Sequence, residues 1–147
     1  MRKWLDELAS VLHRNYLKPI GFKKNARTFT RDQGEYLERI NLQSGWSAPG
    51  MKKWTYYVNV GVVFKGIPLA GMSFGQPNVH WSQRIETIVG GAYKIRRYSE
   101  EKDTDREATE LAGYVIAASE NVQKEIVNIR KLVVHRKKPW AEYQFPR

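Results

Sequence analysis

Residues 54–64, WTYYVNVGVVF, constrain the fold more than any other part of the chain. The even-numbered side chains of this segment form a nearly pure apolar set: Trp54, Tyr56, Val58, Val60, Val62 and Phe64. Because successive side chains of a strand point to opposite faces, this alternation predicts a central β-strand with one face in the core. Gly61 inside the strand indicates a bulge or the close approach of another element.

Helical patterns flank this strand at both ends of the chain. Residues 2–17 place Trp4, Leu8, Val11 and Leu12 at helical spacing, and Pro19 and Gly21 follow, which predicts an amphipathic N-terminal helix that ends there. Near the other end, Thr104 followed by Glu107 fits a capping box. The long helix that follows carries an apolar stripe with Ser119 as its one polar residue: Ala108, Leu111, Ala112, Val115, Ile116, Val122, Ile126 and Ile129.

The segments between these elements read mainly as strands. Asp32-Gln33-Gly34 predicts the turn of a hairpin, and its second arm places Tyr36, Glu38, Ile40 and Leu42 on one face, with Ile40 and Leu42 indicating the core side. Residues 79–89 fit a strand or a short helix equally well, and the segment after them reads as extended. We therefore expect one α+β domain over residues 1–147. An antiparallel sheet of about four to five strands packs against the N-terminal helix and the long C-terminal helix, with residues 138–147 as a loose or folded-back tail.

Composition limits the compartment and the chemistry. The 147 residues contain no Cys, which excludes disulfides, thiolate metal sites and a cysteine nucleophile. Asp6 and Glu7 interrupt the apolar run that a signal peptide needs, and no run approaches the ~20 apolar residues of a membrane span. We expect a cytoplasmic protein. Its net charge of +10 favours acidic partners.

The sequence contains no recognisable catalytic or metal-binding motif. His13, His80 and His135 show no ligand spacing, and no nucleophile elbow, P-loop or dinucleotide-binding glycine motif occurs. The carboxylates at the start of the long helix are explained by capping. We therefore expect no cofactor, no metal and no enzymatic activity; the alternative is an enzyme with an unrecognised site around His80 and Arg84.

The strongest polar constellation is His80, Trp81 and Arg84, joined by Gln43 and Asn59 if the polar faces of their strands line a cleft. Histidine and arginine together can hold an acidic group or a phosphate. The structural alternative places Trp81 in the core and pairs Arg84 with a carboxylate. The remaining predicted binding residues are cations and one aromatic: Arg39, Tyr57, Arg96 and Arg97.

The cations of residues 16–31 raise a separate question. Read as one strand, this segment places Lys23, Arg27 and Arg31 on one face, which favours the solvent side of an edge strand over a nucleic-acid grip. The favoured function is accordingly a protein-binding module, of the immunity or antitoxin kind, that uses a basic, aromatic-bearing surface to hold an acidic protein. The alternative is phosphate binding, with Trp46, Tyr57 or Trp140 as stacking platforms and these further cations: Lys52, Lys53, Lys65, Arg136, Lys137 and Lys138.

Four short motifs occur in order along the chain: LKPIGFKKNARTFTR, YLERINLQSG, YYVNVGVVF and VHWSQRIETIV. In this order they resemble the bacterial family named domain of unknown function 4304, over about residues 4–89. The resemblance implies a fold, and it carries over no reaction and no catalytic residues.

Overall fold

The computed structural model describes residues 2–45, 54–69, 79–91, 93–99, 101–135 and 143–146. Its helical segments are α1 (Arg2–Leu12), η1 (His13–Leu17), η2 (Lys18–Ile20), α2 (Ile85–Val89), α3 (Thr104–Lys124) and α4 (Ile126–His135). Its strands are β1 (Lys23–Asn25), β2 (Thr28–Asp32), β3 (Tyr36–Ser44), β4 (Trp54–Phe64), β5 (Trp81–Arg84) and β6 (Arg96–Tyr98).

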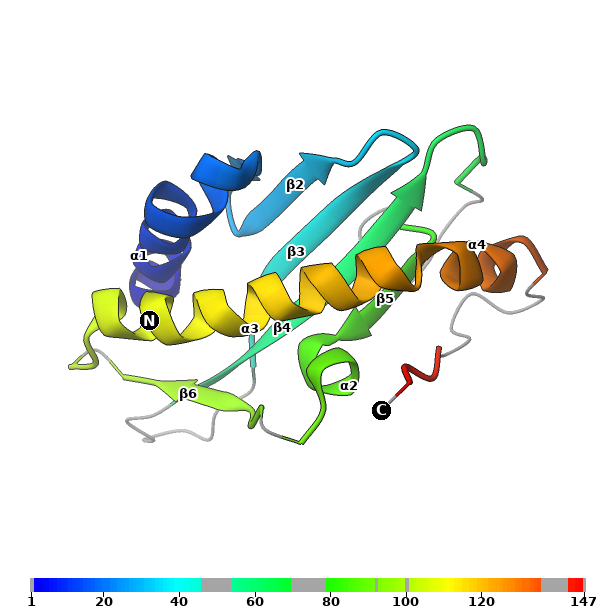
Figure 1. Cartoon of the computed structure of the whole chain (residues 1–147). Helices are drawn as coiled ribbons and strands as arrows, with labels where there is room; N and C mark the ends of the chain where they lie inside the picture. Colours follow the sequence, from blue (N-terminus) through cyan, green and yellow to red (C-terminus); the bar gives the residue numbers. More distant parts are fainter. Residues whose placement is uncertain are drawn as a thin grey trace.

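The six strands form one antiparallel sheet in the order β1-β2-β3-β4-β5, with β6 also paired to β4. α1, α2 and α3 lie over one face of this sheet, and α3 crosses it in front in Figure 1. None of the helices that the structure describes lies on the opposite face. The predicted α+β architecture is confirmed, with one strand more than the expected range.

β4 is the central strand, as its alternation predicts. Its side chains from Tyr56 to Phe64 at even positions are buried beneath the helices, while Trp54 at its end is half-buried. At Gly61 the register continues without a bulge, opposite Arg39 on β3 and Ser82 on β5. A Cβ there would lie 3.0 Å from the Val79 side chain, so close approach is the reason for this glycine.

The N-terminal helical region ends at Pro19 and Gly21 as predicted, but it is not one continuous α-helix. α1 stops at Leu12, one π-helical turn and one 3-10 turn follow, and the chain reverses at Gly21 with φ +100°. Glycine adopts this left-handed conformation without a steric penalty, which explains its place after Pro19.

Residues 23–32 form two strands rather than the expected one. Ala26, at φ +54°, lies in the turn between β1 and β2. The expected solvated face of Lys23, Arg27 and Arg31 is wrong for both arginines: Arg27 pairs with Asp6 at 3.1 Å, and Arg31 lies on the helix side with buried Phe29. Lys23 remains exposed.

The start of α3 differs from the predicted capping box. Asp103 is the N-cap, and its carboxylate accepts hydrogen bonds from the N–H groups of Asp105 and Arg106 at 3.0 and 3.4 Å. Glu107 turns toward the sheet and is buried. The apolar stripe is mostly buried as predicted, but the helix is interrupted at Glu125, where α3 ends and α4 begins.

Two open alternatives are resolved by the structure. Residues 81–84 are a strand and 85–89 a helix, so both patterns in 79–89 are present. In the tail, residues 143–146 fold back, with Phe145 buried. The predictions for Trp46, Lys52, Lys53, Trp140 and the cations at 136–138 fall outside the described residues.

Candidate binding face of the sheet

The face of the sheet opposite the helices, which we call the outer face, is defined by strand register. Odd-numbered residues of β4 lie on it, together with the residues paired to them. Its members are Lys23, Asn25, Thr28, Thr30, Asp32, Leu37, Arg39, Asn41, Gln43, Thr55, Tyr57, Asn59, Gly61, Val63, Ser82, Arg84 and Arg97.

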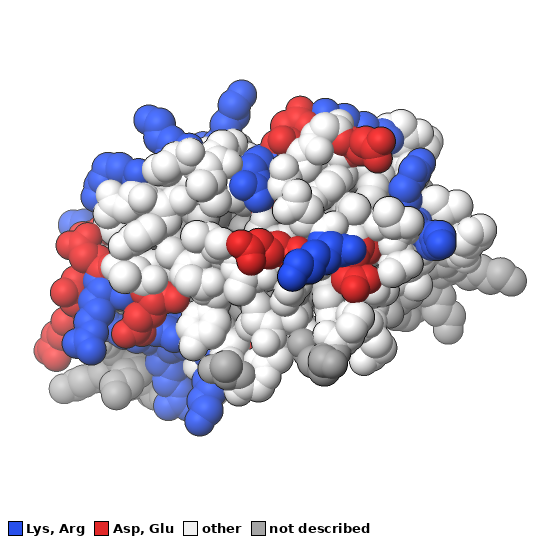
Figure 2. All heavy atoms as spheres, in the orientation of Figure 1, with Lys and Arg blue, Asp and Glu red and all other residues white. Residues whose placement is uncertain are grey.

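Positive charge dominates this outer face. Among its strand residues, four are cations (Lys23, Arg39, Arg84, Arg97) and one is an anion, Asp32. Lys65 Nζ holds both Asp32 oxygens at 2.7 and 2.8 Å, and this hydrogen bond lowers the pKa of the Asp32 carboxyl. On the helix side, acidic and basic side chains lie among one another (Figure 2).

Arg84 and Tyr57 form a cation–π contact on the outer face. The guanidinium carbon lies 3.7 Å from the centre of the Tyr57 ring, where a carboxylate partner was expected. A guanidinium stacked by its face on an aromatic ring keeps the N–H groups in its plane for carboxylate oxygens. Arg84 is exposed, so these donors are accessible to a partner.

A row of amides runs across the three neighbouring strands. Asn59 Nδ2 donates to Gln43 Oε1 at 2.9 Å and to Asn41 Oδ1 at 3.3 Å. Asn41 Nδ2 in turn donates to Thr28 Oγ1 at 2.9 Å. These bonds fix the orientation of each amide, and the exposed Gln43 side chain presents its NH₂ group to solvent.

A cavity of about 480 Å³ opens where β1 begins, beside the end of β2. Its lining includes outer-face residues and residues from the helix side: Ile20, Gly21, Lys23, Thr30, Arg31, Asp32, Gln33 and Leu37. It joins cationic and apolar groups at the edge of the outer face.

The structure brings six of the nine predicted site residues to this face and places three elsewhere. Arg39, Gln43, Tyr57, Asn59, Arg84 and Arg97 share the outer face. Trp81 is paired with Val62 and lies in the core, against Phe145, as its structural alternative predicted. Because Trp81 and Arg84 are three residues apart on one strand, their side chains point to opposite faces.

His80 is held by main-chain groups. Its Nδ1 accepts a hydrogen bond from the Phe64 N–H at 2.8 Å, and its Nε2 therefore carries the proton and donates to the Ile67 carbonyl at 3.0 Å. The ring is buried and fastens the turn after β4. His80 and Arg84 consequently do not converge.

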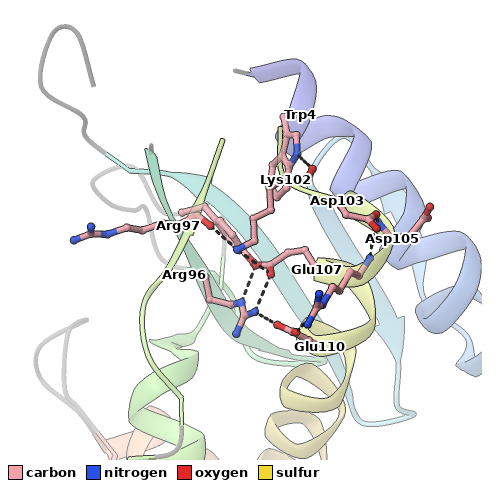
Figure 3. A network of polar contacts seen from close by, with 10 residues as sticks. Trp4, Arg96, Arg97, Lys102, Asp103, Asp105, Glu107 and Glu110 are labelled. Carbon is pink, nitrogen blue, oxygen red and sulfur yellow. Dashed lines mark hydrogen bonds and ion pairs between the residues drawn. The ribbon is translucent and has the colours of Figure 1, made fainter. Parts of the chain in front are cut away.

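Arg96 lies beneath α3 in a buried ion-pair network (Figure 3). Its guanidinium donates to both oxygens of Glu107, at 2.7 and 2.8 Å, and also binds Glu110. The Tyr56 hydroxyl donates to Glu107, and Lys102 lies 3.2 Å from the same carboxylate. Burial alone would raise the pKa of the Glu107 carboxyl, but the bonds from Arg96 and Tyr56 outweigh it and hold the pKa below its ordinary value.

Glu38 is a second buried carboxylate whose hydrogen-bond partners the sequence analysis did not predict. Ser119 Oγ lies 2.7 and 2.9 Å from its two oxygens and donates to them, and Arg31 Nη2 donates to Ser119 at 2.7 Å. Glu38 and Ser119 were each the polar exception in an apolar pattern. Two such exceptions on facing elements are a signal that they pair, because buried polar groups need partners.

Comparison with known proteins identifies the family. The chain matches the family described as Domain of unknown function (DUF4304) over residues 13–143, which is most of its length. The chain belongs to this family. The resemblance of the sequence motifs is thereby confirmed, and the DUF4304 match extends it through α3 and α4. No curated protein and no solved structure matches the chain.

Two further properties of this DUF4304 protein concern the described residues alone. No three His, Asp or Glu side chains in them are grouped as a metal ion would require. None of the helices they form has the length and apolar character of a membrane span.

Proposed function

We propose that this DUF4304 protein is a non-enzymatic binding protein whose outer face docks an acidic protein, in the manner of an immunity protein or antitoxin. The observation that carries the proposal is the excess of cations over anions on the outer face, beside a helix side of mixed charge. Complementary charge of this kind steers association and selects acidic surfaces. The proposed partner is met in the cytoplasm, as the absence of Cys favours.

The aromatic content of the outer face favours a protein over a nucleic acid. Sheets that bind single strands commonly stack two or three bases on aromatic rings. Tyr57 is the one aromatic among the strand residues of the outer face, and Arg84 already covers one side of its ring. The exposed Gln43 amide, which the buried Asn59 orients, instead suits the hydrogen-bonding groups of a protein surface.

The placement of the titratable groups favours binding over catalysis. Both His80 nitrogens engage main-chain atoms, and the carboxylates of Glu38 and Glu107 are buried with hydroxyl and guanidinium partners. A general acid or base must reach the reacting group. The two glutamates connect α3 to the sheet, and His80 holds the turn after β4.

The test compares two charge-reversed variants with equal net charge. The outer-face variant carries Lys23→Glu, Arg84→Glu and Arg97→Glu, and the matched control carries Arg14→Glu, Arg106→Glu and Arg130→Glu on exposed helical positions. Each tagged chain is incubated with lysate of the native cell, once without and once with nuclease, at about physiological salt. Recovered proteins are quantified, and circular dichroism verifies folding.

We expect an acidic protein that the wild-type chain and the control retain and the outer-face variant loses. Equal retention by both variants would overturn the proposal. Retention that disappears on nuclease treatment would replace it with phosphate binding. In that case oligonucleotide affinity falls by about 10³ or more between roughly 50 and 200 mM salt.

A further inference from the structure

The C-terminal residues 143–146 lie between β5 and the junction of α3 and α4, and we call the place that they fill the groove. Gln83 Nε2 donates to the Tyr143 carbonyl at 3.0 Å, and the Tyr143 hydroxyl donates to Glu125 Oε2 at 2.6 Å. Gln83 belongs to β5, and Glu125 is the residue at which α3 ends. The segment is thus held from two elements that are distant in sequence.

Aromatic side chains anchor the same segment. Phe145 is 8% exposed, and its ring centre lies 6.0 Å from that of Trp81 on β5. The Tyr143 and Phe145 rings meet edge to face at 4.8 Å, while Gln144 between them is exposed. The segment has no helix or strand of its own. The buried Phe145, the partly buried Tyr143 and the main-chain hydrogen bond are contacts of the kind that an extended peptide makes in a groove.

Two buried polar atoms of β5 are not used by the resident segment. Trp81 Nε1 and Gln83 Oε1 are buried, and in the described part of the chain they have no hydrogen-bond partner. One is a donor and the other an acceptor, and both side chains lie on the same face of β5. A buried polar atom left unpaired is unfavourable, so a segment that pairs with both atoms binds better than the tail does.

We propose that this groove is a peptide-binding site that residues 143–146 fill in the resting protein, and that an extended Tyr-x-Phe segment of another protein displaces them. The aromatic pair of the incoming segment replaces Tyr143 and Phe145, with its phenylalanine against Trp81. Its main chain supplies a carbonyl to Trp81 Nε1 and an N–H to Gln83 Oε1. The proposal is independent of the outer face, because Trp81 and Gln83 lie on the helix side of the sheet.

The test uses the full chain and a synthetic peptide with the sequence of residues 141–147, AEYQFPR, labelled at its amino terminus. The receptor is the Phe145→Ala variant, whose own tail competes less, and fluorescence anisotropy measures binding. We expect this variant to bind the peptide about tenfold more tightly than the wild-type chain does, a factor that corresponds to about 1.4 kcal/mol. Adding Gln83→Ala to the receptor should reverse this gain.

Two controls make the result specific. A peptide in which alanine replaces the phenylalanine should bind neither receptor. The outer-face variant with Lys23→Glu, Arg84→Glu and Arg97→Glu should bind the AEYQFPR peptide as the wild-type chain does, which separates this groove from the proposed function.

Should Phe145→Ala lose its circular dichroism signal, Tyr143→Phe serves as the receptor, because it removes only the hydroxyl bond to Glu125. A gain of a few-fold in peptide affinity is then expected. The proposal is overturned if a folded receptor variant binds the peptide no better than the wild-type chain, or if the alanine peptide binds equally well.

Discussion

Two buried glutamates connect the same helix to the sheet from opposite directions. Glu107 reaches from α3 to Arg96 and Tyr56, whereas Glu38 reaches from β3 to Ser119 on α3. Twelve residues separate 107 from 119, or about 18 Å along a helix. α3 is therefore fixed to the sheet at two separated points, and each point depends on a buried carboxylate whose oxygens are hydrogen-bonded.

Glu107→Gln should destabilise the protein strongly. The substitution leaves Arg96, whose side chain is mostly buried, with Glu110 as its remaining carboxylate partner. Breaking one side of a buried ion pair costs about 3 kcal/mol. Urea unfolding at neutral pH measures this loss, and the conservative exchange at the exposed Glu120 provides the control, with a change within about 0.5 kcal/mol.

The stability difference between the wild type and Glu107→Gln should depend on pH. The folded-state pKa of Glu107 is lowered, so its contribution to stability is full above the unfolded-state pKa and is lost as pH falls through the folded-state pKa. The difference in unfolding free energy between wild type and Glu107→Gln should therefore narrow on acidification below about pH 4.5. A difference that stays constant to acidic pH would contradict a charged Glu107.

Ser119→Ala should remove the link between Arg31 and Glu38. The Ser119 hydroxyl accepts a hydrogen bond from the Arg31 guanidinium and donates one to the Glu38 carboxylate. Without this hydroxyl, the buried carboxylate keeps only the long contact of 3.5 Å from Arg31 Nη2 to its Oε1. A buried group left without its hydrogen bond costs about 1–3 kcal/mol. Thermal or urea unfolding measures the effect. Ser10→Ala on the exposed side of α1 is the matched control and should be neutral or slightly stabilising.

At the scale of elements, the first turn of α3 allows two interpretations: an N-cap at Asp103, or a capping box formed by Thr104 and Glu107. The structure places the cap at Asp103, so Asp103→Ala should cost about 1 kcal/mol, while Thr104→Ala changes stability little. A capping box at Thr104 and Glu107 predicts the reverse order. Urea unfolding of both variants distinguishes the two, and a larger loss for Thr104→Ala would contradict the observed cap.

Elements with strong periodicity were predictable, and those decided by tertiary contacts were not. The alternation of β4 identified its strand and its buried face. The Thr104–Glu107 spacing could not reveal that Glu107 binds Arg96, because that contact depends on where β6 lies. The turn at Ala26 was also missed, since a positive φ is uncommon for a residue with a Cβ and gives no sequence signal.

The sequence predicted most residues of the candidate site, but not which of them lie side by side. Alternation already placed Tyr57 and Asn59 together on β4, and register brought Gln43 and Arg84 beside them. The grouping with His80 failed because the contacts of its ring depend on the turn after β4. Residue type suggested the chemistry, and only the register of the strands decides which of these groups meet.

At the scale of the whole molecule, the outer face concentrates part of a net charge of +10. Lys23 and Arg39 lie in one register row with a single strand between them, so their Cα atoms are separated by about 10 Å. Repulsion over such distances is unscreened at low ionic strength. It opposes folding while it favours an acidic partner.

Salt should therefore stabilise the protein by reducing this repulsion. The Debye length falls from about 30 Å at 10 mM to about 10 Å at 100 mM ionic strength, which is close to the spacing of the outer-face cations. We expect the unfolding free energy of the wild-type chain to rise by a few tenths to about 1 kcal/mol over this range. In the variant with Lys23→Gln, Arg84→Gln and Arg97→Gln the rise should be smaller.

A control with the same change in net charge tests whether position matters. Arg27, Lys65 and Arg106 each lie beside a carboxylate, so their replacement by glutamine removes attractions that salt weakens. The rise of unfolding free energy with salt should then be at least as large as in the wild-type chain. Equal reductions in both triple variants would mean that net charge alone sets the response, and the outer face would hold no special share of the repulsion. A reduction confined to the outer-face variant would locate the repulsion on the surface that the proposed acidic partner neutralises.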